Sequence, residues 1–488
     1  MNPLFAAIRN LLLATSFAVF VANSQAQTAD WPGYLRTIDH TSYNQLASAI
    51  TPGNAANLSV QWSFVDPPPT MDGQPAAGFN SSPTVSSGVV YIGSNTGEFY
   101  AIDENTGAVL WQQLLGYTTP LTCRAGKGIT STATVAPDPV SGTPMVYVGG
   151  GDGYLYALDA ATGNIVWRQF VIDVGTTENS GYLYGSPLVF NKTISIGLSS
   201  SCDNPLVRGG LKSFDQHTGK PLRVYWTTPT GTVGASVWTS AASDGRSIWI
   251  TVGNGDAGDS FSIVRLSSAL KFTSKWTVPN TAGTDLDWGS SPTLFQAKIN
   301  GVRTQMIGAN EKNGTFYALK AADLASGPVW SRVVGSQGDF FNFGICTAAA
   351  AWDSTHKRLF VGSNQTVINS QTFPGAVRAL DPATGGVIWE TGVTAGPVMG
   401  SPTLNGAGVL AAGTYSLPAP TQNKVYLLDA SDGAILTSFD EMSQVFAQPV
   451  FADTHLFIAT TGGLLTSFAP PTGSARRMEG RALPHPCF

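Results

Sequence analysis

The stretch Val146–Trp167, VYVGGGDGYLYALDAATGNIVW, decides the fold because versions of it recur along the chain. An earlier copy spans Val90–Trp111, and later copies span Leu359–Trp389, with a longer hairpin, and Val409–Thr437, without the tryptophan. Each copy consists of short runs of alternating apolar residues, separated by Gly-rich or Asp-x-x-Thr-Gly turns. Such runs are typical of half-buried strands, so the pattern predicts a series of antiparallel hairpins.

The length of the repeat predicts a β-propeller. A four-stranded sheet of this size cannot cover both of its faces alone, so the copies must stack against one another. Tryptophans recur 50 to 59 residues apart, at Trp111, Trp167, Trp226, Trp276, Trp330 and Trp389. Candidate first strands begin at Ser82-Pro83, Ser131-Thr132, Ser186-Pro187, Thr239-Ser240, Ser291-Pro292, Thr347-Ala348, Ser401-Pro402 and Gln448-Pro449. We therefore expect an all-β, eight-bladed propeller of four-stranded antiparallel blades.

The two ends of the repeat region predict how the ring closes. The eighth repeat ends at Leu464–Phe468 without an outer strand, whereas Leu58–Trp62 is an outer strand without a repeat of its own. We expect the N-terminal strand to complete the last blade, because this leaves no open sheet edge at the seam. The expected parts are then a strap at 27–57, the propeller at 58–470 and a tail at 471–488.

Residues 1–26 have the pattern of a secretory signal peptide. A basic region ends at Arg9, an apolar run spans Leu11–Val21, and Ser24-Gln25-Ala26 has small residues where cleavage needs them. We expect cleavage before Gln27 and a periplasmic or secreted protein, with an uncleaved anchor as the alternative. No later segment approaches 18 apolar residues, so we expect no transmembrane span after the signal is removed.

Composition and motif content argue against several function classes. The formal net charge of −5 makes a nucleic-acid partner unexpected. The five histidines are scattered, so neither a hydrolytic triad nor a histidine metal cluster is expected. Gly149–Gly151 lies in a hairpin rather than before a helix, which is not the setting of a phosphate-binding loop. The chain has no Cys-x-x-Cys-His, and this predicts no covalently attached haem c.

The chain has four cysteines, Cys123, Cys202, Cys346 and Cys487. Export permits disulfides. We favour a Cys123–Cys202 pair because each lies in a loop of neighbouring early blades, although the sequence leaves other pairings open.

The motif Tyr-Ala-Leu-Asp-x-x-Thr-Gly-x-x-x-Trp at Tyr156–Trp167 resembles the repeat of the pyrroloquinoline-quinone (PQQ) propellers. The chain is similar to the eight-bladed quinoprotein dehydrogenases and their polyvinyl-alcohol dehydrogenase branch. This likeness covers nearly all of the mature chain. It implies an enzyme that oxidises a small or polymeric alcohol or sugar with PQQ and passes electrons to an external acceptor. The outer-membrane assembly lipoprotein BamB has a similar repeat and binds no quinone. The alternative is therefore a non-catalytic propeller that binds a protein or polysaccharide.

The resemblance assigns a catalytic centre, one motif at a time. Trp238, in Val-Trp-Thr-Ser, matches the tryptophan on which the planar quinone stacks. Asp287, in Leu-Asp-Trp-Gly, resembles the catalytic carboxylate, and Lys312, in Lys-Asn-Gly, resembles the cation that contacts the quinone carbonyls. Asp287 would accept the alcohol proton as hydride moves to the quinone, with Lys312 stabilising the developing oxyanion.

A calcium site is implied in the same way. Asn254, in Val-Gly-Asn, resembles an amide ligand, and Asp203 and Asn204 precede Val-Arg-Gly as the acidic ligand does in the family. Calcium takes carboxylate and carbonyl oxygens and would polarise the quinone. Arg208, in the same Val-Arg-Gly, is a further candidate for cofactor contact.

The chain departs from the family pattern at three places. Cys123-Arg124 replaces two adjacent cysteines over the quinone, and we keep Cys123 and Arg124 as candidate cofactor contacts. Asn80 replaces a glutamate before the first-blade proline, and an Asn-Trp motif of blade six is replaced near Cys346. These changes bear on both quinone affinity and turnover.

Each candidate also has a purely structural explanation. Trp238 would then be a blade-packing aromatic, Asn254 a turn residue with positive φ, Asp287 a solubilising charge and Lys312 a hairpin tip. We expect the repeat aspartates to be structural only, because an aspartate bonds the backbone of its own turn. They are Asp103, Asp159, Asp215, Asp381 and Asp429.

Overall fold

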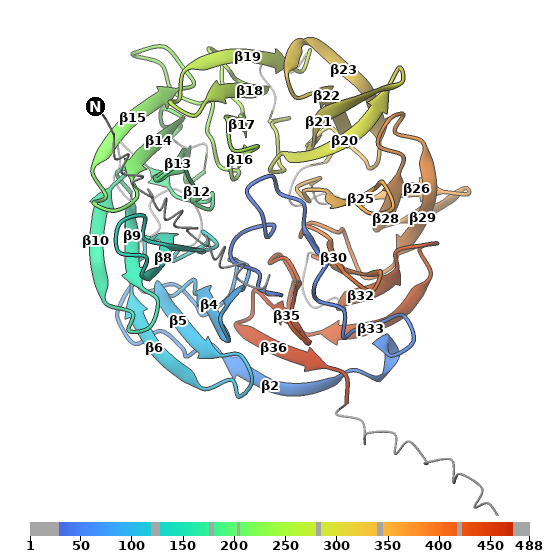
Figure 1. Cartoon of the computed structure of the whole chain (residues 1–488), viewed down its shortest axis with the longest axis horizontal. Coiled ribbons are helices and arrows are strands. Elements are labelled where there is room, and N and C mark those ends of the chain that lie inside the picture. Colours follow the sequence, from blue (N-terminus) through green and yellow to red (C-terminus); the bar gives the residue numbers. More distant parts are fainter. Residues whose placement is uncertain are drawn as a thin grey trace, which may run out of the picture.

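The strands form eight sheets around a central axis (Figure 1). The computed structural model describes residues 29–118, 127–174, 180–202, 205–279, 285–338, 345–416 and 422–471. In this part of the chain, each blade is a four-stranded antiparallel meander with its fourth strand on the rim. The predicted all-β, eight-bladed fold is confirmed.

The first four blades follow one another along the chain. Blade 1 contains β3 (Thr84–Ser86), β4 (Val89–Gly93), β5 (Glu98–Asp103) and β6 (Val109–Leu114), and blade 2 contains β7 (Thr134–Pro137), β8 (Pro144–Gly149), β9 (Tyr154–Asp159) and β10 (Ile165–Phe170). Blade 3 contains β12 (Leu188–Phe190), β13 (Thr193–Ser200), β14 (Gly210–Asp215) and β15 (Pro221–Trp226), with the short β11 (Gly181–Tyr182) also paired to β13. Blade 4 contains β16 (Ala242–Ser243), β17 (Ser247–Thr251), β18 (Ser262–Ser267) and β19 (Phe272–Thr277).

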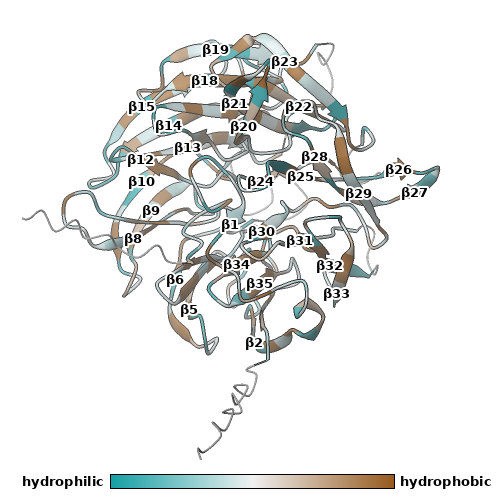
Figure 2. Ribbon diagram, turned by 45° about the vertical axis from the view of Figure 1, so that its right-hand side comes forward, coloured by the Kyte–Doolittle hydropathy of each residue, from teal (hydrophilic) through white to brown (hydrophobic). Residues whose placement is uncertain are grey.

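The second four blades complete the ring. Blade 5 contains β20 (Thr293–Ile299), β21 (Val302–Glu311), β22 (Thr315–Lys320) and β23 (Asp323–Val333). Blade 6 contains β24 (Ala351–Asp353), β25 (Arg358–Ser363), β28 (Gly375–Leu380) and β29 (Val387–Val393), and its extra hairpin of β26 (Thr366–Ile368) and β27 (Gln371–Phe373) projects from the rim (Figure 2). Blade 7 contains β30 (Thr403–Asn405), β31 (Val409–Gly413), β32 (Asn423–Asp429) and β33 (Ile435–Glu441). Blade 8 contains β34 (Val450–Ala452), β35 (His455–Ala459) and β36 (Leu464–Ala469).

The outer strand of blade 8 comes from the other end of the propeller. β2 (Ser59–Val65) pairs antiparallel with β36, with Val60 opposite Phe468 and Val65 opposite Leu464. The sheet order is therefore β2-β36-β35-β34. β2, the first blade strand in the chain, lies beside β36, the last one, so the sheet edge at the seam of the ring is paired.

Most tryptophans of the repeat pack on a glycine in the turn of the next blade. Trp111 Nε1 donates to the carbonyl oxygen of Ala160 at 3.0 Å, and a Cβ on Gly163 would lie 2.5 Å from the Trp111 ring. Gly163 also has φ 73°, a conformation that L side chains rarely adopt. The same contact joins Trp62 to Gly107, Trp167 to Gly219, Trp330 to Gly385 and Trp389 to Gly433. This docking explains why a tryptophan and a turn glycine recur together.

The docking position is not a tryptophan in every blade. The strand registers place Arg223 there in blade 3 and Ser274 in blade 4, and Trp226 lies three residues beyond Arg223, opposite Gly210, where it is 42% exposed. Blade 7 carries Thr437 where a tryptophan would stand, and the last blade has no such turn because its outer strand is β2. The 3-10 helix η1 (Ala55–Asn57), which leads into β2, contacts β33 instead.

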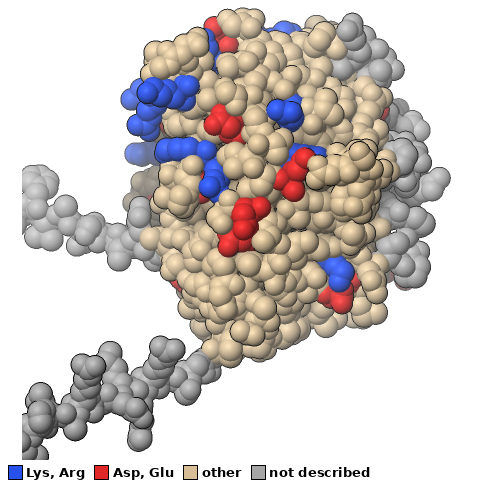
Figure 3. Space-filling model, turned by 90° about the vertical axis from the view of Figure 1, so that its right-hand side faces the viewer, with Lys and Arg blue, Asp and Glu red and all other residues tan. Residues whose placement is uncertain are grey.

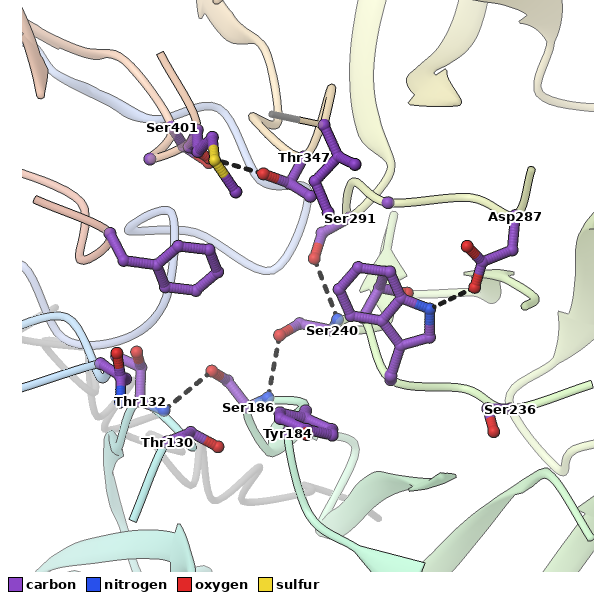
Figure 4. Close-up of a pocket in the computed structure, with 18 of the residues that line it drawn as sticks. Thr130, Thr132, Tyr184, Ser186, Ser236, Ser240, Asp287, Ser291, Thr347 and Ser401 are labelled. Atoms are coloured by element: carbon purple, nitrogen blue, oxygen red, sulfur yellow. Dashed lines mark hydrogen bonds between the residues drawn. The ribbon is translucent and has the colours of Figure 1, made fainter. Parts of the chain in front are cut away.

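Hydroxyl side chains join neighbouring blades around the axis. The backbone N–H of Ser82 donates to Thr132 Oγ1 at 2.9 Å, and that of Thr132 donates to Ser186 Oγ at 3.1 Å (Figure 4). In the same way, the backbone N–H of Ser186 donates to Ser240 Oγ, and that of Ser240 donates to Ser291 Oγ. Because each hydroxyl accepts one of these bonds, its own proton can still be donated to a ligand.

The segment 29–57 lies across one end of the ring. It exchanges backbone hydrogen bonds with seven blades, through Trp31 and Val85, Pro32 and Val135, Ile38 and Ser243, Asp39 and Leu294, Thr41 and Trp352, Ser42 and Leu404, and Ala29 and Asp453. β1 (Tyr43–Asn44) also pairs in parallel with β30. Tyr34 in this segment lines the central cavity described below, so the segment supplies part of its floor.

Charge is sparse on the rim. The face in Figure 3 is mostly uncharged, and no broad basic patch covers it. In the described part of the chain, the one-turn η1 is the only helix, and none there has the length and apolar character needed to cross a membrane.

Candidate active site

A cavity of about 710 Å³ lies at the centre of the ring. Its wall contains residues from the segment 29–57 and from every blade. Figure 4 shows lining residues of blades 2 to 7 around it. Four of the predicted site residues line it, namely Trp238, Asn254, Asp287 and Lys312. Segments far apart in sequence therefore meet at one place, as the propeller geometry predicts.

Asp287 is the centre of this group. It is 4% exposed, and Trp238 Nε1 donates to its Oδ2 at 2.9 Å (Figure 4). Lys312 Nζ lies 2.5 Å from Asp287 Oδ1 and 2.9 Å from Asp285 Oδ1. The backbone N–H of Lys312 also donates to the carbonyl oxygen of Asp287 at 3.1 Å. The segment before blade 5 and the turn after β21 are thus held together by both backbone and side-chain contacts.

The electrostatics favour an ionised but weakly acidic Asp287. Burial raises the pKa of Asp287 to about 6, against the opposing effects of Lys312 and the Trp238 indole. Burial alone would lower the pKa of Lys312, but Asp287 and Asp285 outweigh it, and the pKa of Lys312 is raised. At neutral pH the lysine is therefore charged and Asp287 is a carboxylate with an affinity for protons well above that of an exposed aspartate.

The predicted calcium ligands receive little support from the described residues. Asn254 lines the cavity, and its Nδ2 lies 3.5 Å from Asp285 Oδ1. Asp203 and Asn204 lie outside the described residues. Within the ranges that the structure describes, no three His, Cys, Asp or Glu side chains gather as a metal site would require.

Arg208 is not among the described residues that line the cavity, and its role as a cofactor contact stays a prediction. Its guanidinium donates to the carbonyl oxygen of Thr228, at 2.7 Å from Nη2, and lies 4.3 Å from the centroid of the Trp226 ring. The exposed face of Trp226 thus holds the guanidinium by a cation–π contact.

Two of the four cysteines, Cys202 and Cys346, lie among the described residues. Cys202 lines the cavity and is disulfide-bonded, whereas Cys346 is buried and free. Cys123 and Arg124 lie outside the described residues, so the Cys123–Cys202 pair and the two cofactor contacts stay predictions.

Lys127 is a cavity residue that the sequence analysis missed. Its Nζ donates to the carbonyl oxygen of Ser201 at 2.7 Å and to the Tyr184 hydroxyl, and it lies 4.9 Å from the Tyr184 ring centroid. Burial lowers the pKa of Lys127 to about 8. Among the described residues no carboxylate pairs with it, so this lysine offers its charge to an anion. It stands in Gly-Lys-Gly outside the repeat, where no sequence signal marks it.

The wall of the cavity is chemically divided. Every charged residue that lines it comes from blades 2 and 5 or their entry loops. The residues from blades 6 to 8 are uncharged and include Ile345, Met399, Tyr415 and Phe446. The rings of Tyr415 and Phe446 meet edge to face, with centroids 6.0 Å apart. One side of the cavity therefore carries the charges that suit an anion, and the other combines these apolar side chains with the uncharged polar groups of Thr347, Ser401 and Gln448.

Comparison with known families agrees with this architecture. Residues 31–254 match a model described as the β-propeller domain of glucose/ethanol/alcohol dehydrogenase, a PQQ family. Residues 374–476 match a model described as outer membrane protein assembly factor BamB, the second PQQ family. The chain is a PQQ-repeat propeller.

Curated relatives and solved structures of this PQQ-repeat propeller include quinoproteins. A quinohemoprotein alcohol dehydrogenase of Comamonas testosteroni is 25% identical over 343 residues, covering 62% of this chain and 46% of the relative. A polyvinylalcohol dehydrogenase of Sphingopyxis sp. is 24% identical over 413 residues, covering 74% and 58%. The crystal structure of the Comamonas enzyme superposes with a TM-score of 0.71 at 19% identity, covering 94% of this chain and 83% of that one, which shows the shared fold. In sequence, the PQQ-repeat propeller spans about half the length of the first curated relatives it matches.

The relatives correct one cofactor prediction. The lack of Cys-x-x-Cys-His predicts no haem c, yet the Comamonas relative is named a quinohemoprotein. The prediction of no haem c is therefore contradicted by these relatives. Because the match covers only about half of that relative, the residues of this PQQ-repeat propeller do not define its full set of redox groups.

Proposed function

We propose that this protein binds PQQ in the central cavity and oxidises an alcohol there. The observation that carries the proposal is the convergence of Trp238, Asp287 and Lys312 on one cavity, with an acid, a cation and an aromatic ring in mutual contact. The names of the alcohol dehydrogenase relatives agree with it.

The residues of the cavity fit a planar, anionic quinone. The indole of Trp238 offers an aromatic surface for stacking. Lys127 offers a cation that has no carboxylate partner among the described residues, and the axial hydroxyls of Ser186 and Ser240 can donate hydrogen bonds. Bound PQQ would supply the two-electron acceptor for the alcohol carbon.

The protein's own residues would supply the proton chemistry. Asp287 accepts the proton of the substrate hydroxyl, and the Trp238 N–H fixes the orientation of its carboxylate. Lys312 keeps Asp287 ionised at neutral pH. Because the pKa of Asp287 is about 6, the base is present above that pH and is lost by protonation below it.

The divided wall favours an alcohol with an apolar body over a sugar. The hydroxyl to be oxidised must lie at Asp287, in blade 5, and the adjoining blades 6 to 8 present Ile345, Met399 and Phe446. Polar side chains on this side, such as Thr347 and Gln448, could bond some hydroxyl groups of a sugar. Those placed against Ile345, Met399 and Phe446 would have no partner, at a cost in binding. An aliphatic chain, or the hydrocarbon backbone of a polymeric alcohol, would bury apolar surface instead.

The proposal extends to export and electron transfer. The signal-like sequence of residues 1–26, which lie outside the described residues, supports a periplasmic or secreted location. The electrons would leave for a further redox acceptor.

A quinone titration tests the proposal. Tryptophan fluorescence and absorbance are followed as PQQ is added, with and without a divalent cation, to the wild type, Trp238→Ala and Lys127→Met. We expect saturable binding that is at least about tenfold weaker in both variants, the loss of one stacking or charge contact. Dye reduction is then measured with primary alcohols of increasing chain length and with glucose, and rates should rise with chain length. Failure to bind PQQ would overturn the function, and equal rates with glucose would overturn the substrate preference.

A further inference from the structure

Glu311 is a buried acid beside the active site that the proposed chemistry does not use. It is the last residue of β21 and is 0% exposed. Among the described residues its Oε1 has no hydrogen-bond partner, and its Oε2 accepts one bond, from the backbone N–H of Asn313 at 3.2 Å. A carboxylate held in this way would pay most of its desolvation cost without compensation.

The backbone places Glu311 directly behind the Asp287–Lys312 pair. Trp288, the neighbour of Asp287, forms a β-bridge with Glu311, and the N–H of Lys312 donates to the carbonyl oxygen of Asp287. Side chains alternate along a strand, so Glu311 lies on the same face as Ile307 and Ala309. Both belong to an apolar cluster that contains Trp288. Glu311 therefore combines an apolar setting with a close charged neighbour.

Among the described residues, no cation forms an ion pair with Glu311. Lys312 Nζ is already shared by Asp285 and Asp287, at 2.9 and 2.5 Å. A third carboxylate would compete for the same ammonium. Burial, with the charge of Asp287 adding to it, raises the pKa of Glu311 to about 8, and Lys312 only partly offsets this rise. The other titratable group that acts on this region is the buried Cys346 thiol, whose pKa burial raises to about 11.

We propose that Glu311 is a positioning residue that stays protonated in the working site and so leaves the Lys312 ammonium to Asp287. This role rests on the proposed function, in which Asp287 must be ionised. When Glu311 loses its proton in alkali, a second buried negative charge draws on Lys312 and weakens its pairing with Asp287. The proposal therefore gives the enzyme an alkaline limit that Asp287 alone would not produce.

Glu311→Gln tests the proposal because the amide imitates a protonated acid. Glu441→Gln is a matched control, since Glu441 is also buried, with its pKa raised by burial to about 7, but it ends β33 in blade 7 and the charge that acts on it is Asp440 rather than Asp287 or Lys312. In the wild type and Glu441→Gln we expect dye reduction to fall by about tenfold between pH 7 and 9, as one group of pKa about 8 titrates. In Glu311→Gln it should change less than about twofold. An unchanged alkaline limb in Glu311→Gln would overturn the role.

A second measurement needs neither cofactor nor substrate. The fluorescence component of Trp238, defined by its loss in Trp238→Phe, is titrated from pH 4 to 10, because its indole is bonded to Asp287. We expect a transition near pH 6 from Asp287 in all variants and a second one near pH 8 that only Glu311→Gln lacks. If PQQ binding fails but the second transition behaves in this way, Glu311 keeps its link to the pair while the proposed function falls. If the transition persists in Glu311→Gln, the inference fails whatever the protein catalyses.

Discussion

Aspartates in the rim turns and Asp287 at the axis have pKa values shifted in opposite directions. Asp215 stands in an exposed turn, where Thr218 donates to its Oδ1 from both the hydroxyl, at 2.7 Å, and the backbone, at 2.8 Å. These bonds, the hydroxyl bond first, lower the pKa of Asp215, and the pKa of Asp103 is lowered in the same way by Thr106. At the axis, burial raises the pKa of Asp287 to about 6. Local turn chemistry therefore sets the rim aspartates, whereas the assembly of several blades sets Asp287.

The largest effect is expected from Asp287→Asn. The amide keeps the shape and the acceptor for the Trp238 N–H but cannot take a proton, so dye reduction should fall by at least about 100-fold. Thermal unfolding should change little, because a buried charge with a raised pKa is removed. The rim control Asp215→Asn should keep its activity. A parallel loss of folding in Asp287→Asn would make Asp287 a structural residue and erase the comparison.

Removing the partner of Asp287 should move its titration. In Lys312→Met the carboxylate loses its ammonium, so its pKa rises and the midpoint of the pH–rate profile should move upward from about 6 by at least about one unit. Lys275→Met is the control, because Lys275 forms a rim ion pair with Asp259 at 2.9 Å. The profile of the control should not move. A midpoint that stays near 6 in Lys312→Met would show that burial alone governs Asp287.

The smallest effect is expected in the stability of Asp215→Asn. Loss of a charged acceptor in an exposed turn should cost about 0.5–1 kcal/mol of unfolding free energy by urea titration. The lowered pKa of Asp215 means that its stabilising effect is present above its unfolded pKa and is lost as the pH falls. Asp287 has the opposite sign, because its raised pKa costs stability as the pH rises towards 6. The difference in stability between Asp215→Asn and the wild type should therefore shrink in acid, and a constant difference would contradict the turn argument.

The fold was predictable because its stabilising contacts repeat with the sequence. Docking of Trp111 on Gly163 involves residues that recur in most blades, so spacing alone reveals it. The core of the site was predictable for a different reason, since Asp287 and Lys312 lie in motifs that resemble a family. Lys127 was not predicted as a site residue because the tyrosines around it lie some 55 residues later in the sequence, in blade 3. The contact of Arg208 with the exposed ring of Trp226 lies outside the repeat pattern, so spacing does not reveal it.

The pairing of β2 with β36 has a consequence for biosynthesis. About 400 residues separate the two strands, so β2 leaves the ribosome tens of seconds before its partner exists, at about 5–20 residues per second. During elongation the early blades can form, but β2 must wait as an unpaired strand that exposes backbone and apolar side chains. Because every blade contributes to the cavity wall, the completed pocket is among the last features of the nascent protein to appear.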